Sequence, residues 1–228
     1  MKKKFLQAPA WLSIVLCLLL TACFSKEPEQ RKAYMEFLQT HLVDNSDKSS
    51  LTILTPRQQE AFGPYGESFL IIKTFFLGMN ERTGVGRNAA GKPKLPDLAQ
   101  LVDDPGSIEA FTQYYTKRFD ETGVLVQAAD AAKAKLQLPD DLKAVFDKAY
   151  DRYVSKRGRD WESLRPLWEA MNDQTRKVAT FVREHRSKIQ ISGNGMLTND
   201  QAILTQMQEL LKDLHAKQNA FLKAANAL

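Results

Sequence analysis

The residues nearest to a known chemical pattern are Gly86 to Lys92, which have the spacing of a phosphate-binding loop up to its last position. That last position requires Ser or Thr, because a hydroxyl there holds Mg²⁺. Pro93 occupies it and offers neither a hydroxyl nor a backbone N–H to a phosphate. The stretch from Thr83 to Lys94 is therefore interpreted as a flexible basic loop, and we expect no nucleotide binding.

The histidines form no local metal-binding pattern. His41, His185 and His215 fall on three different expected helices, whereas common zinc motifs place their ligands at short, fixed spacings. Carboxylates are interleaved with basic residues, and no Gly-x-Ser-x-Gly or His-Glu-x-x-His motif is present. We expect no catalytic residue, no metal and no cofactor, and a protein that is not an enzyme. A carboxylate pair assembled in space would leave no such trace in the sequence.

Cys23 is the residue whose surroundings point to a specific reaction. Lys2 to Lys4 give the chain a positive start, and Trp11 to Leu20 is an uncharged, mostly apolar run with the length of a signal-peptide core. Pro9 separates the two, so the apolar run falls short of the length that a transmembrane helix needs. The run ends in small residues directly before Cys23.

Residues Leu20 to Cys23, which read Leu-Thr-Ala-Cys, resemble the lipobox of bacterial lipoproteins. The resemblance implies that the Cys23 sulfur takes a diacylglyceryl group and that the leader is cut before this cysteine, so acyl chains such as palmitate hold the protein on a membrane. We expect a signal peptide over 1–22 and a lipidated tether over 23–29. Inner-membrane retention of lipoproteins usually goes with Asp after the cysteine, so Phe24 favours the periplasmic face of the outer membrane. The alternative is an ordinary secretory signal with an incidental cysteine.

The charge of the chain is largely that of its leader. The formal net charge of +5 includes three leader lysines, so the remaining 206 residues carry 29 basic and 27 acidic side chains. Such a balance does not indicate nucleic-acid binding. Of the two cysteines, Cys17 leaves with the leader and Cys23 is blocked by lipid, so no disulfide is expected. The rest of the chain is long enough for one domain with a sizeable core.

Three segments resemble a known family, the YiaF-type lipoproteins, an enterobacterial family defined only as a domain of unknown function. They are Cys23 to Gln39, Leu54 to Tyr65 and Asp140 to Tyr150. The resemblance implies an exported, lipidated and mainly helical protein. It provides no catalytic residues, and only Cys23 corresponds to a residue with a role.

Helical spacing of apolar residues recurs along the chain. It predicts helices from Pro28 to about Val43, from a Thr55–Gln58 capping box to about Arg82, from Ser107 to Leu136, from Pro139 to Tyr153, from Trp161 to Ile189 and from Thr198 to Leu228. Gly63–Pro64 should kink or delay the second helix, and Pro166 should bend or restart the fifth. The second helix is apolar almost all round, which places it in the middle of a bundle.

Two connections have recognisable chemistry. Lys188 to Leu197 alternates polar and apolar residues around Ser192 to Gly195, which predicts a small β-hairpin. Lys156 to Arg159 reads as a basic turn. The predicted fold is all-α: an antiparallel bundle of about five or six helices with one small hairpin near 188–198, in a single domain over 30–228.

The leading functional hypothesis is a non-catalytic envelope factor that docks on another protein or on an anionic envelope polymer. The alternatives are a carrier or sensor of an apolar ligand, built on the aromatic interior, and an enzyme acting on cell-wall or lipid material. An up-down topology would also place two basic segments, Arg82 to Lys94 and Lys156 to Arg159, at the membrane-facing end of the bundle, where they could bind anionic lipid.

Overall fold

The structure is a computed structural model, and it describes residues 26–45, 50–83, 96–192 and 195–227. Within these ranges the elements are α2 (Glu27–Leu38), η1 (Gln39–Val43), α3 (Pro56–Phe62), η2 (Gly63–Ser68), α4 (Phe69–Thr83), α5 (Leu98–Asp103), α6 (Pro105–Lys133), α7 (Asp140–Tyr150), η3 (Asp151–Ser155), α8 (Lys156–Glu162), α9 (Arg165–Glu184), β1 (Gln190–Ser192), β2 (Gly195–Leu197) and α10 (Gln201–Ala225). The all-α prediction is confirmed, and so is the small antiparallel hairpin, in which Ile191 pairs with Met196.

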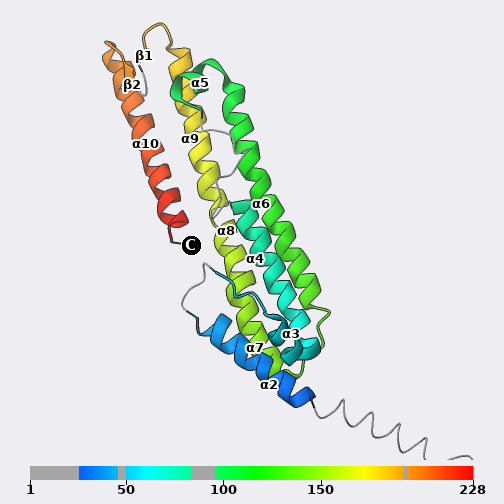
Figure 1. Cartoon of the computed structure of the whole chain (residues 1–228). Helices are drawn as coiled ribbons and strands as arrows, with labels where there is room; N and C mark the ends of the chain where they lie inside the picture. Colours follow the sequence, from blue (N-terminus) through cyan, green and yellow to red (C-terminus); the bar gives the residue numbers. More distant parts are fainter. Residues whose placement is uncertain (1–25, 46–49, 84–95, 193–194, 228) are drawn as a thin grey trace, which may run out of the picture. The chain divides into compact units, whose positions relative to one another are not determined.

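The chain forms two compact units. Unit 1 is Met1–Lys73 with Ala132–Tyr153, and unit 2 is Thr74–Ala131 with Val154–Leu228. The helical ribbons of both are drawn in Figure 1. The expectation of a single domain over 30–228 stays a prediction, and each unit is described here by itself.

Unit 1 is organised around α2, which contacts α3, η2 and α7. Its buried face carries Tyr34, Phe37 and Leu38, the helical spacing expected from the sequence. The Phe37 ring lies 5.1 Å from that of Phe62 and 5.6 Å from that of Phe69, so rings from three elements fill this core directly. The Tyr34 hydroxyl shares a buried hydrogen bond of 2.8 Å with the Ser68 hydroxyl. Burial raises the pKa of Tyr34 because the charged phenolate would lose its solvation.

Unit 2 is built on a hairpin of two helices. Figure 1 shows α9 in yellow beside α10 in orange and red, joined through β1 and β2. Their seam is apolar, with Val178 and Val182 of α9 packed in one cluster with Met207 of α10. On α9's other side lie α5 and α6, and ring contacts and ion pairs hold α6 in place. Separate apolar clusters therefore join α9 to its neighbours, and one of them holds Val102 of α5 together with Val182 of α9 and Met207 of α10.

Several element boundaries follow local chemistry that the sequence already displayed. The Thr55 hydroxyl accepts from the Gln58 N–H at 3.2 Å, while the Gln58 side chain accepts from the Thr55 N–H at 2.9 Å, so the predicted capping box is confirmed. The 3₁₀ turn η2 follows at Gly63, and α9 restarts beside Pro166, as the prolines predicted.

Other boundaries differ from the prediction. The last helix does not use a Thr198–Gln201 capping box, because the Asp200 carboxylate accepts from the N–H groups of Ala202 and Ile203 instead. The third helix begins at Pro105, not at Ser107, since proline is well tolerated in a first helical turn. Likewise α2 begins at Glu27, so residues 27–29 of the expected tether form its first turn.

The prediction of a basic turn at Lys156 to Arg159 is wrong. These residues form the first turn of α8, which continues the helical run of α7 and η3 from 140 to 162. The Arg157 guanidinium donates to Asn80 Oδ1 at 2.8 Å and lies over the Phe76 ring. The up-down count of connections that placed these residues at a membrane-facing end therefore fails.

The expected burial of the second helix on all sides is also wrong. Phe75, Phe76 and Met79 are buried, but Leu70 and Leu77 are about half exposed, at 52% and 55%. One side of α4 therefore faces solvent. Exposed apolar side chains such as these are common on folded proteins. Of the basic loop predicted from Thr83 to Lys94, the structure describes only Thr83, which is the last residue of α4. Residues 84–95, including the phosphate-loop-like stretch, lie outside the described residues.

Candidate functional site

Cys23 and the leader lie outside the described residues, so the site predicted from the sequence is approached through the helix that follows it. Since α2 begins at Glu27, the chain between Cys23 and the helix has a reach of about 14 Å when fully extended. Within the described ranges, none of the helices has both the length and the apolar character needed to cross a bilayer.

Polar contacts tie the start of α2 to two other elements of unit 1. The Tyr65 hydroxyl donates to Glu27, and Arg31 lies 3.6 Å from Glu27 Oε1 and 3.5 Å from Asp141 Oδ1. The hydrogen bond to Glu27 raises the pKa of Tyr65, because the bond holds the phenolic proton. The start of α2 is thereby fixed against η2 and the start of α7.

Gly63 gives the same corner its shape. Its φ of 52° is the positive φ of a glycine at the C-cap of α3, and a Cβ at this position would lie 2.5 Å from Gln30 Cδ of α2. The positive φ therefore favours glycine at the turn between α3 and η2, where a Cβ would also meet the movable end of the Gln30 side chain.

Two further contacts hold α7 and η3 in unit 1. Burial opposes the charged form of Asp147, but Lys133 and Lys143, at 2.8 Å and 2.6 Å, outweigh it and lower the pKa of Asp147. Arg152 of η3 donates to the backbone carbonyls of Val43, the last residue of η1, and of Asn45, just beyond it. A cation at this position satisfies carbonyls that the helix end leaves free.

The three segments that resemble the YiaF-type family all lie in unit 1. Leu54 to Tyr65 and Asp140 to Tyr150 supply α3, the start of η2 and α7, which pack on the α2 supplied by the first segment. The structure thus brings together residues that are more than a hundred positions apart, around a helix that begins four positions after Cys23 in the sequence.

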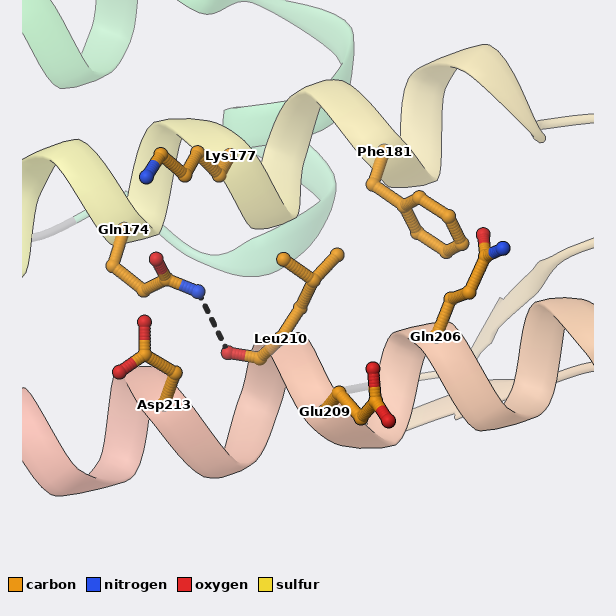
Figure 2. A pocket seen from close by; sticks show the side chains of 7 residues that line it. All are labelled: Gln174, Lys177, Phe181, Gln206, Glu209, Leu210 and Asp213. Carbon is orange, nitrogen blue, oxygen red and sulfur yellow. Dashed lines mark hydrogen bonds between the residues drawn. The ribbon is translucent and has the colours of Figure 1, made fainter.

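A groove lies on unit 2, between α9 and α10. Its cavity volume is about 460 Å³. Figure 2 shows the side chains that line it, which are Gln174, Lys177, Phe181, Gln206, Glu209, Leu210 and Asp213. Carboxamides, charged groups and one ring predominate, so the groove suits a polar ligand better than an acyl chain.

Gln174 forms the floor of the groove. Its side chain is 2% exposed, and its Nε2 donates to the Leu210 backbone carbonyl at 3.0 Å (Figure 2). A buried carboxamide in an otherwise apolar helix seam costs free energy unless it is hydrogen-bonded. On the rim, Asp213 is paired with Lys217 at 2.6 Å, whereas Lys177 and Glu209 make no ion pair with the described residues.

The three histidines are placed separately. His41 lies in η1 beside the Phe37 ring, His185 follows α9 and packs on Phe181, and His215 is exposed on α10. Among the residues that the structure describes, no group of three or more His, Cys, Asp or Glu side chains could hold a metal ion.

No pattern in the sequence indicated the groove. Gln174 lies within the helix predicted from Trp161 to Ile189, and it is the residue whose side chain crosses to α10. The available signal was Gln174 itself, a polar residue one position from the apolar repeat of this helix. It could not by itself show that Lys177 and Glu209 lie on facing walls.

The comparisons with known proteins agree with the resemblance to the YiaF-type family described above for three segments of the chain. The family model described as "Protein of unknown function (DUF3053)" matches residues 11–228. The chain belongs to this family. It is 26% identical over 225 residues to the uncharacterized protein YiaF of Escherichia coli strain K12, covering 93% of this chain and 90% of that protein. The YiaF protein of Shigella flexneri is similar to the same extent. No solved structure matches this chain significantly.

Proposed function

We propose that this protein is a lipoprotein on the periplasmic face of the outer membrane, held by acyl chains on Cys23, and that it acts as a non-catalytic interaction factor of the cell envelope. The observation that carries the proposal is the Leu-Thr-Ala-Cys sequence ending at Cys23, followed after only three residues by the start of α2. With two or three acyl chains at the cysteine, the protein would stay on the membrane, since one chain alone binds only marginally.

The placement of unit 1 supports a docking role. The segments that resemble the family surround α2, whose start would lie within about 14 Å of the lipidated cysteine. The corner that includes Glu27, Arg31 and Asp141 would then face the membrane side of the periplasm. A protein or an anionic envelope polymer could be held between this unit and the bilayer.

The packing of the aromatic residues favours docking over the carriage of an apolar ligand. In unit 2 the Trp168 ring lies 5.4 Å from Phe111, 4.8 Å from Tyr115 and 5.7 Å from Phe221. Rings at these distances are in direct contact and fill the space between them. The same holds for the rings around Phe37 in unit 1.

The anchor is tested with Cys23→Ser in the full chain expressed in a Gram-negative host. We expect the variant to lose palmitate labelling and to keep its leader uncut, whereas Cys17→Ser, which changes the other cysteine of the leader, should behave as the parent. A parent chain that incorporates no labelled palmitate would contradict the proposal.

The choice of membrane is tested separately with Phe24→Asp. In lipoproteins Asp at this position usually retains the protein at the inner membrane, so the variant should move there on a density gradient, while Phe24→Leu should remain with the outer membrane. A parent that already sediments with the inner membrane would contradict the outer-membrane proposal and leave the lipid anchor standing. Crosslinking of the parent in cells then identifies what it docks on.

A further inference from the structure

The groove between α9 and α10 has one free charge on each wall. Lys177 projects from α9 and Glu209 from α10; both are exposed, and neither pairs with another described residue. Opposite charges on neighbouring helices can pair across a seam, as e and g residues do in coiled coils. Here they remain apart over an open cavity, so a ligand that carries both charges can meet each of them.

The floor and ends of the groove carry groups that suit a peptide backbone. Gln206 offers an exposed carboxamide, which both donates and accepts hydrogen bonds as a peptide group does. The Phe181 ring, drawn at the opposite end of the groove from Gln174 in Figure 2, offers an apolar surface for a side chain.

The length of the groove limits the ligand. From Gln174 to Phe181 the α9 axis advances about 10 Å. An extended peptide advances about 3.3 Å per residue, so about three residues fit with their two ends near opposite parts of the groove.

We propose that this groove binds a short peptide of about three residues with a free amino end and a free carboxyl end. Lys177 meets the carboxylate and Glu209 meets the ammonium, while Gln206, which lies beyond Glu209 toward Phe181 in Figure 2, hydrogen-bonds the peptide near its amino end. The site differs from the docking corner of unit 1, and its occupation does not depend on the lipid anchor.

The test uses trialanine as the probe and the full chain in detergent, with binding followed by amide NMR shifts. Trialanine should shift the groove residues in a saturable manner. Forms that are acetylated at the amino end or amidated at the carboxyl end should bind more weakly, by about two- to fivefold for each charge removed, as expected of an exposed ion pair.

Variants assign each charge to its wall. Lys177→Ala should weaken the binding of free trialanine by the same factor, and it should not weaken the binding of the amidated peptide any further. Glu209→Gln should likewise weaken the binding of free trialanine, and it should not weaken the binding of the acetylated peptide any further. The controls are Glu169→Ala on α9 and Lys212→Ala on α10, exposed charges on the same helices that do not line the groove. They should leave the affinity unchanged.

Such peptides could come from proteins or from the cell wall, and their stereochemistry distinguishes the two sources. All-L trialanine represents fragments of proteins, and a form whose last two residues are D represents cell-wall peptides. Tighter binding of either form supports the site and indicates its source. The proposal is overturned if trialanine shifts the groove amides no more than its doubly blocked form does, or if the control variants weaken binding as much as Lys177→Ala.

Discussion

Replacement of Gly63 by Ala is the most direct test of how the packing of α3 and η2 against the start of α2 is built. At φ 52° and ψ −138°, the backbone of this residue lies in a region that is open essentially to glycine alone. An L-residue held there costs about 1–3 kcal/mol. The new Cβ would also lie 2.5 Å from Gln30 Cδ, but Gln30 is a flexible side chain whose end can move away.

The strain is offset in part because Ala reduces the entropy of the unfolded chain. We therefore expect Gly63→Ala to lower the free energy of unfolding by about 2 kcal/mol. For a chain of this size, that lowers Tm by about 4–8 °C. Urea unfolding and thermal unfolding, both followed by circular dichroism, measure the two quantities.

Two companion variants separate the causes. Gly66→Ala, in the same 3₁₀ turn, places its Cβ 3.4 Å from Phe62 Cβ, an ordinary contact, and should change stability by no more than about 0.5 kcal/mol. The double variant Gln30→Ala with Gly63→Ala removes the contact but keeps the backbone strain, so most of the loss should remain. Full recovery in the double variant, or a Gly63→Ala protein as stable as its parent, would refute the reasoning from φ.

Three further predictions concern other positions. Gly158→Ala would place a Cβ 2.6 Å from Val126 Cγ2 and should destabilise the protein by about 1–3 kcal/mol, with recovery when Val126→Ala is added. A Cβ added at Gly123 in α6 meets nothing within 4 Å, so Gly123→Ala should stabilise the protein by up to about 1 kcal/mol. Thermal unfolding measures whether Gly158→Ala lowers Tm and Gly123→Ala raises it. The pKa of Asp147 is lower in the folded protein than in the unfolded chain, where it is about 3.9. Asp147 therefore stabilises the folded protein at pH values above about 3.9, and this stabilisation is lost as the pH falls through the pKa of the folded state. Asp147→Asn should therefore be less stable than the parent at neutral pH but lose less stability on acidification to about pH 3, as measured by urea unfolding at both pH values.

Local patterns in the sequence predicted most elements because the interactions that form them join residues three or four positions apart. The Thr55–Gln58 capping box and the hairpin at 190–197 are of this kind, and both are confirmed. The basic residues at 156–159 show the limit of such reasoning. Their composition is typical of a turn, yet α8 forms because Gly158 allows a close approach to Val126 and Arg157 bonds Asn80.

The proposed leader and lipid site at Cys23 rest on the sequence alone, because signals for export and lipid attachment are short linear segments. The family membership is equally a property of the sequence. The corner formed by Glu27, Tyr65 and Asp141 and the groove with its facing charges were decided only by the tertiary structure. Their residues are separated by tens of positions, and their distances depend on how apolar helix faces pack, which no local spacing encodes.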